Sequence, residues 1–472
     1  MTRDQCLADA AAYFDDGRFF ADLARRVAQP TESDAGRVPP ELAAYLQDEL
    51  LVPLARLGFH GELLPNPVAG GGPFLIARRI EDPAAPTVLT YGHADVVSGQ
   101  ADRWRSGLSP WTLVADGERW YGRGTADNKG QHSINLAGLA AALRARNGRL
   151  GYNVTVLIET GEEAGSPGLH ALCEAQAQAL RAHLLIACDG PRVQAQRPTL
   201  FLGSRGAVNF SLTLTARDRA YHSGNWGGVL KNPATVLAHA IGTLVDRHGR
   251  LQVAALRPPP ISEAVRRALA QVDVGGDADD PALDAGWGEP GLSAAERLFG
   301  WNTLEVLALG AGHPQRPVNA IPATAVAHCQ LRFVVGTDWR SLETVVREHL
   351  AREGYPEIEV AVTLAGAATR LDVDSPWVGW ASRSIVASGA PAPTVLPNLA
   401  GSLPNDVFAE LLGLPTLWVP HSYPACAQHA PNEHLLAPLA REGLRLMAGL
   451  YWDLGEPAGS PAAAPWRTRL AA

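Results

Sequence analysis

Continuous apolar runs that stop at polar loops are the strongest pattern in the first half of the chain. They stand at residues 87–90, 154–158 and 184–187. Such runs are typical of parallel strands that are buried on both faces of a sheet. Between them, apolar positions at helical spacing predict helices over 131–146 and 167–183. Strands that alternate with helices in this way predict an α/β fold.

A different pattern begins after Phe201. Residues 208–214 alternate apolar and polar side chains, as an antiparallel strand with one face in water does. We expect this strand to open a second, α+β domain spanning residues 204–368. Its further elements are predicted as helices over 233–246 and 338–353 and strands over 325–333 and 357–364. Residues 258–300, with three consecutive prolines, are interpreted as an irregular insertion within that domain.

The α/β pattern resumes near residue 369, with a helix predicted over 377–388 and an apolar strand over 415–419. We therefore expect residues 1–203 and 369–472 to form one discontinuous domain, into which residues 204–368 are inserted. The tail from about residue 456 is rich in alanine and proline and is predicted to be poorly ordered.

Composition narrows the classes of function. A chain of 472 residues with 46% hydrophobic side chains can fill two cores. The net charge of −8 and the lack of a basic cluster argue against a nucleic-acid or membrane partner. Five cysteines without CxxC spacing indicate reduced thiols, and the N-terminal residues lack the pattern of a signal peptide. A cytoplasmic protein that acts on small molecules is expected.

Candidate chemistry collects where the predicted strands end and one helix begins. The potential ligands of a metal ion there are His93, Asp127, Glu163, Asp189 and His429. Loops at the carboxyl ends of parallel strands are where open α/β sheets bind ligands, and a carboxylate before a helix is favoured by the helix dipole. Two imidazoles and three carboxylates suit zinc and exceed what one tetrahedral ion with an open position needs. Two ions that share one bridging carboxylate would use all five.

Each of these side chains also has an ordinary structural interpretation. Taken alone, His93 is a loop histidine bonded to backbone, Asp127 is a helix cap, and Asp189 belongs to a turn. Glu162 and Glu163 alone are typical of a solvated loop. Their joint placement at one edge of one predicted sheet favours the metal site.

Four motifs resemble those of a known family. They are residues 91–97 (YGHADVV), 121–130 (YGRGTADNKG), 159–166 (ETGEEAGS) and 429–433 (HAPNE). The chain is similar over nearly its whole length to the co-catalytic di-zinc metallopeptidases and deacylases, which include carnosinase, aminoacylase, carboxypeptidase G and succinyl-diaminopimelate desuccinylase. The resemblance implies a zinc-aminopeptidase-like catalytic domain with an inserted α+β lid that also forms a homodimer.

The resemblance also divides the ligands between two zinc ions, for which Mn²⁺ or Co²⁺ could substitute. It implies that His93 and Asp189 hold one ion, that Glu163 and His429 hold the other, and that Asp127 bridges both.

Two further acidic residues receive roles from the resemblance. Asp95 would orient His93 from behind. Glu162 would be the general base, which takes a proton from the water between the metals and later gives it to the leaving amine.

Further candidates lie in the lid and its neighbourhood. By resemblance, His222 reaches the site of a neighbouring subunit and stabilises the oxyanion, and Arg332 holds a substrate carboxylate. Asn302 and the turn of Gly401 and Ser402 are candidates for the same pocket. Without the resemblance, the sequence favours a surface loop histidine for His222, and the alternative for Arg332 is a strand residue that faces solvent.

The sequence favours a zinc exopeptidase that hydrolyses dipeptides or short peptides through a metal-bridging hydroxide. Asp189 supports this choice, because many deacylases of the family place a glutamate there. The nearest alternative is an amidohydrolase of N-acyl or N-carbamoyl amino acids with the same zinc site. A catalytically silent scaffold is the alternative from another class, but it should lack Glu162 or a ligand, and none is missing.

Overall fold

The computed structural model describes residues 1–33, 38–275 and 281–466. A mixed sheet of eight strands forms the centre of the larger domain, which the sequence predicts to be the catalytic domain, in the order β1-β2-β6-β3-β7-β16-β8-β15. These strands are β1 (His60–Leu64), β2 (Phe74–Arg79), β3 (Thr87–His93), β6 (Asn153–Glu159), β7 (Leu184–Ala187), β8 (Thr199–Phe201), β15 (Thr394–Leu396) and β16 (Thr416–Trp418). β3 pairs in parallel with both β6 and β7, and β16 pairs in parallel with β7. The predicted buried parallel strands are confirmed.

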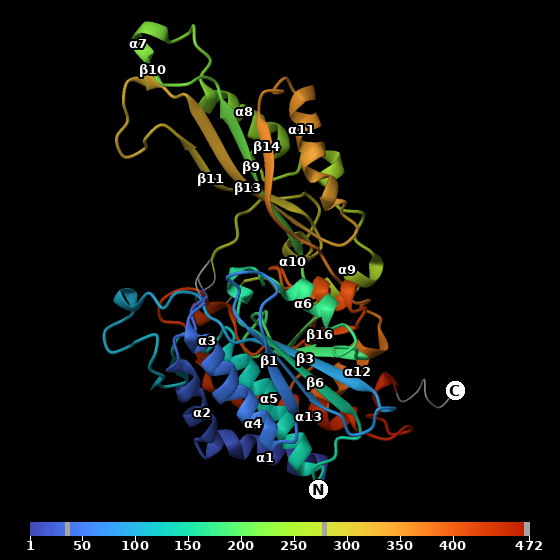
Figure 1. Ribbon diagram of the computed structural model, residues 1–472. Helices are drawn as coiled ribbons and strands as arrows, with labels where there is room; N and C mark the ends of the chain where they lie inside the picture. Colours follow the sequence, from blue (N-terminus) through green and yellow to red (C-terminus); the bar gives the residue numbers. More distant parts are fainter. Residues whose placement is uncertain (34–37, 276–280, 467–472) are drawn as a thin grey trace.

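Helices cover both faces of this sheet (Figure 1). One face packs in a single core with α1 (Arg3–Asp15), α2 (Arg18–Val27), α3 (Pro40–Tyr45), α4 (Val52–Arg56), α5 (Lys129–Ala145), α12 (Pro376–Ala387) and α13 (Ala437–Leu454). The other face packs against α6 (Leu169–Ala175). The helix predicted over 167–183 is therefore too long. Turns follow α6, and the buried Leu180 in them produced the apolar repeat.

A small three-stranded sheet lies beside the main one. It consists of β4 (Val114–Asp116), β5 (Arg119–Tyr121) and β17 (His434–Leu436), with β5 in the middle. The pairing of β17 with β5 brings the chain just after residue 433 next to the chain just before residue 122. Two segments that are about 300 residues apart in sequence, one near residue 122 and one near residue 433, therefore lie side by side.

The lid is a four-stranded antiparallel sheet in the order β11-β13-β9-β14. Its strands are β9 (Gly206–Thr215), β11 (Thr303–Ala311), β13 (Thr324–Phe333) and β14 (Glu359–Gly366), and its helices are α8 (Pro233–Leu244) and α11 (Leu342–Arg352). Burial alternates along β9 and β13, because one face packs on the helices. At the far tip, β10 (Tyr221–His222) pairs with β12 (Ala320–Ile321) and leads into α7 (Ser223–Trp226) (Figure 1).

Residues 258–300 do not form an irregular part of the lid, contrary to the prediction. They contain α9 (Glu263–Leu269) and α10 (Ala294–Phe299). The buried side chains of Val265, Leu269 and Phe299 join the core on the α6 side of the catalytic sheet. The chain thus leaves the lid, packs on the catalytic domain and returns. The acidic stretch at 276–280 lies outside the described residues.

The prediction of a poorly ordered tail is wrong for residues 456–466. Ala464 and Trp466 are buried, and the Trp466 ring packs edge-on against Trp377 of α12. The Trp380 indole N–H donates a hydrogen bond to the Ala462 carbonyl at 3.1 Å. An alanine- and proline-rich composition did not prevent order, because one aromatic side chain anchors the segment. Residues 467–472 lie outside the described part of the chain.

Candidate functional site

Three neighbouring strands of the catalytic sheet end at the site. His93 is the last residue of β3, and Asp189 follows β7 by two residues. After β6, Glu162 and Glu163 form a single 3-10 turn, Glu162–Ala164. Since β6, β3 and β7 are adjacent and parallel, their carboxyl ends bring these side chains to one edge. The side chains that follow the predicted apolar strands therefore lie together at the carboxyl edge of the sheet.

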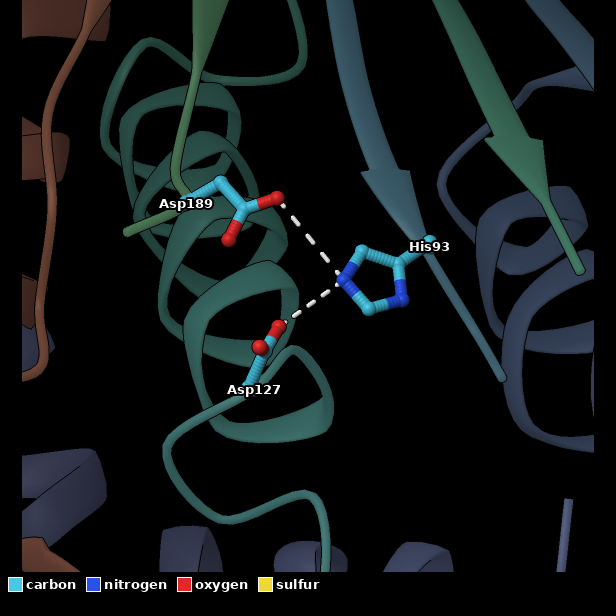
Figure 2. A group of neighbouring side chains, drawn as sticks. All are labelled: His93, Asp127 and Asp189. Carbon is cyan, nitrogen blue, oxygen red and sulfur yellow. Dashed lines mark hydrogen bonds and ion pairs between the residues drawn. The ribbon is translucent and has the colours of Figure 1, made fainter. Parts of the chain in front are cut away.

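Asp127 lies between two groups of ligand atoms. Its Oδ1 is 2.9 Å from His93 Nε2, which is also 3.7 Å from Asp189 Oδ2 (Figure 2). Its Oδ2 is 3.1 Å from His429 Nε2, which in turn is 3.0 Å from Glu163 Oε2. Asp127 stands just before α5, and the peptide bond that follows it is cis. One carboxylate thus directs its two oxygens to two separate groups.

Each of these groups has the spacing of a metal site. The ligand atoms of His93, Asp127 and Asp189 all lie within 4.8 Å of one another, and so do those of Asp127, Glu163 and His429. The donors are nitrogen and carboxylate oxygen, which suit zinc and related divalent ions. Glu163 Oε1 is buried without a hydrogen-bond partner among the described residues. A cation would satisfy that oxygen, so the donor set fits a metal in both groups.

The site holds more buried negative charge than its histidines can balance. Burial, reinforced by the Asp127 charge, raises the pKa of Asp189 to about 7, and burial also raises the pKa of Glu163. Hydrogen bonds to Asp127 and Glu163 raise the pKa of His429 to about 10. A raised pKa means that the buried, crowded negative charge is unfavourable and that added positive charge would stabilise it. A divalent cation in each group would supply that charge.

Asp95 connects the two halves of the site. Its Oδ1 lies 3.3 Å from His93 Nδ1, whose hydrogen bond at 3.1 Å goes to the Asp95 backbone carbonyl, so the orienting role of the carboxylate stays a prediction. The same carboxylate accepts hydrogen bonds from the backbone N–H groups of Glu162 and Glu163, at 3.2 and 3.1 Å. That second role was not predicted, because a sequence does not show which turn a buried carboxylate will meet.

His429 is held differently from the other ligands. It lies in an irregular loop between β16 and β17, and its side chain is 54% exposed. Its φ of 62° is in the left-handed region, which few residues other than glycine adopt. The backbone turn at this position directs the imidazole back toward Asp127. Gln428 also donates a hydrogen bond to Asp127, a contact that sequence reasoning missed.

A family model described as peptidase family M20/M25/M40 matches residues 89–453, which is more than half of the chain. The chain belongs to this family. With the ligand groups described above, membership makes the protein a metallohydrolase. Among the described residues, no helix combines the length and the apolar character that crossing a bilayer requires.

Dipeptidases of the family are among its relatives. The chain is 24% identical to the Beta-Ala-His dipeptidase of Rattus norvegicus over 420 residues, which cover 84% of this chain and 82% of that protein. It is 29% identical to the cysteinylglycine-S-conjugate dipeptidase of Corynebacterium striatum over 341 residues, with 69% and 71% covered.

Solved structures confirm the predicted fold. Human carnosine dipeptidase 1 superposes with a TM-score of 0.74 at 22% identity, over 95% of this chain and 98% of that chain. The M20 family metallo-carboxypeptidase Sso-CP2 of Sulfolobus solfataricus gives a TM-score of 0.77 at 23% identity, with 92% and 98% covered.

Two of the candidates for substrate binding, Arg332 and Ser402, meet at the junction of the two domains. Arg332, on lid strand β13, donates a hydrogen bond from Nη1 to Ser402 Oγ at 3.0 Å. Ser402 belongs to the catalytic domain and follows Gly401. Asn302 is engaged elsewhere. Its side chain bonds the Leu256 carbonyl, Thr337 Oγ1 and the Val334 N–H, all within the lid.

His222 stands apart from the other site residues of its own chain. It ends β10 at the tip of the lid, at the end away from the catalytic sheet (Figure 1). Its Nδ1 accepts a hydrogen bond from the Gly224 N–H at 3.1 Å, and within the described chain it has no contact with a ligand residue. One chain by itself therefore does not bring His222 to the metal groups.

Proposed function

We propose that this metallohydrolase is a zinc-dependent dipeptidase that binds two zinc ions per chain. The observation that supports this most directly is the division of the Asp127 oxygens between two ligand groups. Relatives named as dipeptidases support the substrate class. The lack of a membrane-spanning helix in the described residues is compatible with the cytoplasmic location that we also propose.

Glu162 is the proposed general base. When bound, the zinc ions would acidify a water molecule and polarise the scissile carbonyl. Glu162 would take the proton of the attacking water and return it to the leaving amine. Burial raises the pKa of its carboxyl well above the usual range, and a higher pKa makes the carboxylate a stronger proton acceptor. Among the described residues, the structure records no hydrogen-bond partner for that carboxylate.

Arg332 is the proposed anchor for the free carboxylate of a dipeptide. Arg332 lies on the lid and its guanidinium contacts Ser402 of the catalytic domain, so the side chain lies between the two domains. The neighbouring Arg205 is buried, and its Nη1 has no partner among the described residues. Two guanidinium groups in one partly buried place favour an anionic ligand. An N-acyl amino acid also carries such a carboxylate, so substrate comparison has to separate the two activities.

The substrate class is tested with four compounds and one variant. A dipeptide, its C-terminal amide, and the N-acetyl and N-succinyl derivatives of its C-terminal amino acid are compared by kcat/KM. We expect the free dipeptide to be the best substrate. Arg332→Met should lower kcat/KM for it by about 10–10²-fold, since a charged hydrogen-bonded pair contributes about 1.5–3 kcal/mol, and leave the amide unaffected. Turnover of the acyl compounds alone would establish the deacylase alternative.

The lid tip is proposed to complete the site of a second chain in a homodimer, where His222 stabilises the oxyanion. His222→Ala should then lower kcat by about 10²–10³-fold. Co-expression with a Glu162→Gln chain supplies both intact residues to one site of each mixed dimer. Activity well above that of either variant alone is expected in the purified mixed dimer. No recovery in a dimer of verified mixed composition would contradict the shared site.

A further inference from the structure

A buried carboxylate that is not a ligand joins two of the ligand-bearing loops. Glu433 follows His429 by four residues and is 1% exposed. Its Oε1 accepts hydrogen bonds from the backbone N–H groups of Ala126 and Asp127, at 2.9 and 3.0 Å. Its Oε2 accepts one from the Gly124 N–H at 3.0 Å. The loop that carries the bridging aspartate is thus bound to one side chain from the His429 segment.

Arg123 extends this connection to a third loop. Its Nη1 donates to Glu433 Oε2 at 2.9 Å and to the Ala430 carbonyl at 3.1 Å. Its Nη2 donates to the Ser98 carbonyl at 2.9 Å, in the loop that follows His93. The guanidinium is fully buried. The pair of Arg123 and Glu433 therefore contacts the loops of His93, Asp127 and His429.

The two ligand groups depend on this pair to different degrees. His93 ends a strand that is hydrogen-bonded on both sides, and Asp189 follows another such strand. The sheet holds these two residues without help from Glu433. His429 lies in an irregular loop with a left-handed backbone, and it relies on the few contacts that its segment makes. The Asp127 loop also lacks regular secondary structure, and Glu433, on the His429 segment, accepts three of its backbone N–H groups. These bonds hold the His429 segment against the loop that carries Asp127.

We propose that Glu433, together with Arg123, is a positioning residue that fixes His429 against Asp127 and so determines how tightly the Asp127, Glu163 and His429 group binds its cation. This inference rests on the proposed function, which requires a cation in each group. The His93 group should depend less on Glu433, because strands hold two of its three ligands. A buried ion pair often adds little to stability, so a specific effect on one ion distinguishes positioning from general support.

The test titrates metal-free protein with Zn²⁺ and with Co²⁺ by calorimetry, and compares wild type with Glu433→Gln. Glutamine keeps the size but replaces one acceptor oxygen with a donor group, so backbone N–H groups of the 122–128 loop lose their acceptor. We expect one of the two binding steps to weaken by about 10–100-fold, as is typical when a group behind a metal ligand is removed. The other step should change several-fold less. High metal concentration should restore turnover.

A second readout does not involve metal. Hydrogen exchange of the 122–128 backbone amides in metal-free protein should be faster in Glu433→Gln than in wild type. Glu49→Gln is the matched control, because Glu49 is also buried and forms ion pairs with Arg25 and Arg26. It should change neither the binding steps nor that exchange.

The outcomes separate this proposal from the proposed function. A wild-type protein that saturates with one ion contradicts the two-metal function itself. Two ions in wild type, with unchanged affinities in Glu433→Gln, overturn the positioning role and leave the two-metal site intact. Equal weakening of both steps, or the same loss in Glu49→Gln, also overturns it.

If Glu433→Gln does not fold, Arg123→Lys is the second variant. Lysine keeps the positive charge but cannot make the guanidinium hydrogen bonds to the Ala430 and Ser98 carbonyls, so the same single binding step should weaken.

Discussion

Glu162→Gln is expected to lower kcat by about 10²–10⁴-fold, the usual contribution of a general base, while both metal groups still fill. An amide of the same size cannot accept the proton of the attacking water. The backbone N–H of residue 162 still donates to Asp95, so the turn that carries Glu163 should keep its place. Steady-state kinetics measures the expected fall in kcat, and mass spectrometry of the bound metal measures whether both groups are filled.

The control for this variant is Glu174→Gln, an exposed glutamate of α6, which should retain wild-type turnover. A Glu162→Gln protein that keeps its turnover would falsify the assigned proton transfer. Loss of turnover together with loss of metal would instead place Glu162 among the groups that hold the ions.

Asp127→Asn is expected to bind at most one ion per chain under conditions that saturate wild type with two. Asparagine offers one oxygen, whereas the carboxylate directs one oxygen toward His93 and the other toward His429, so it would serve both proposed ions. Loss of one ion removes several kcal/mol of transition-state stabilisation, so kcat/KM should fall by about 10³-fold or more. Equilibrium dialysis followed by elemental analysis gives the ion count.

Asp453→Asn is the matched change at a second buried aspartate, which pairs with Arg3 at 2.8 Å and lies outside the ligand groups. It should still bind two ions. Two ions in Asp127→Asn would show that Asp127 does not bridge, and each group would then need a separate third ligand.

The predictable part of the fold follows from local pattern. The strands β3, β6 and β7 were predictable because each is a continuous apolar run, and a buried parallel strand needs one. The segment of residues 258–300 was not, since α9 and α10 are too short to show a helical repeat and the sequence does not say which core Phe299 joins. The prediction for the tail was wrong because it rested on average composition, which gives no weight to one buried side chain, Trp466.

The site also has residues that could be predicted from local pattern and residues that could not. His93, Glu163 and Asp189 could be placed from sequence, because a group that directly follows a buried parallel strand has to lie at the carboxyl edge of the sheet. Asp127 could be placed next to them by its position before a helix. Asn302 stays a prediction as a pocket residue, and its side chain is hydrogen-bonded within the lid.

By itself the sequence determined the α/β sheet, the family and the kind of ligands, because apolar runs and the residues after them are local properties. Only the tertiary structure decided that His429 turns back onto Asp127 and that Glu433 and Arg123 connect their loops. It also placed His222 at the tip of the lid, away from the ligands of its own chain. These relations join irregular segments about 300 residues apart, as between Arg123 and Glu433. Neither the spacing of apolar residues nor the position of a strand end predicts these contacts, so they are defined only by the folded chain.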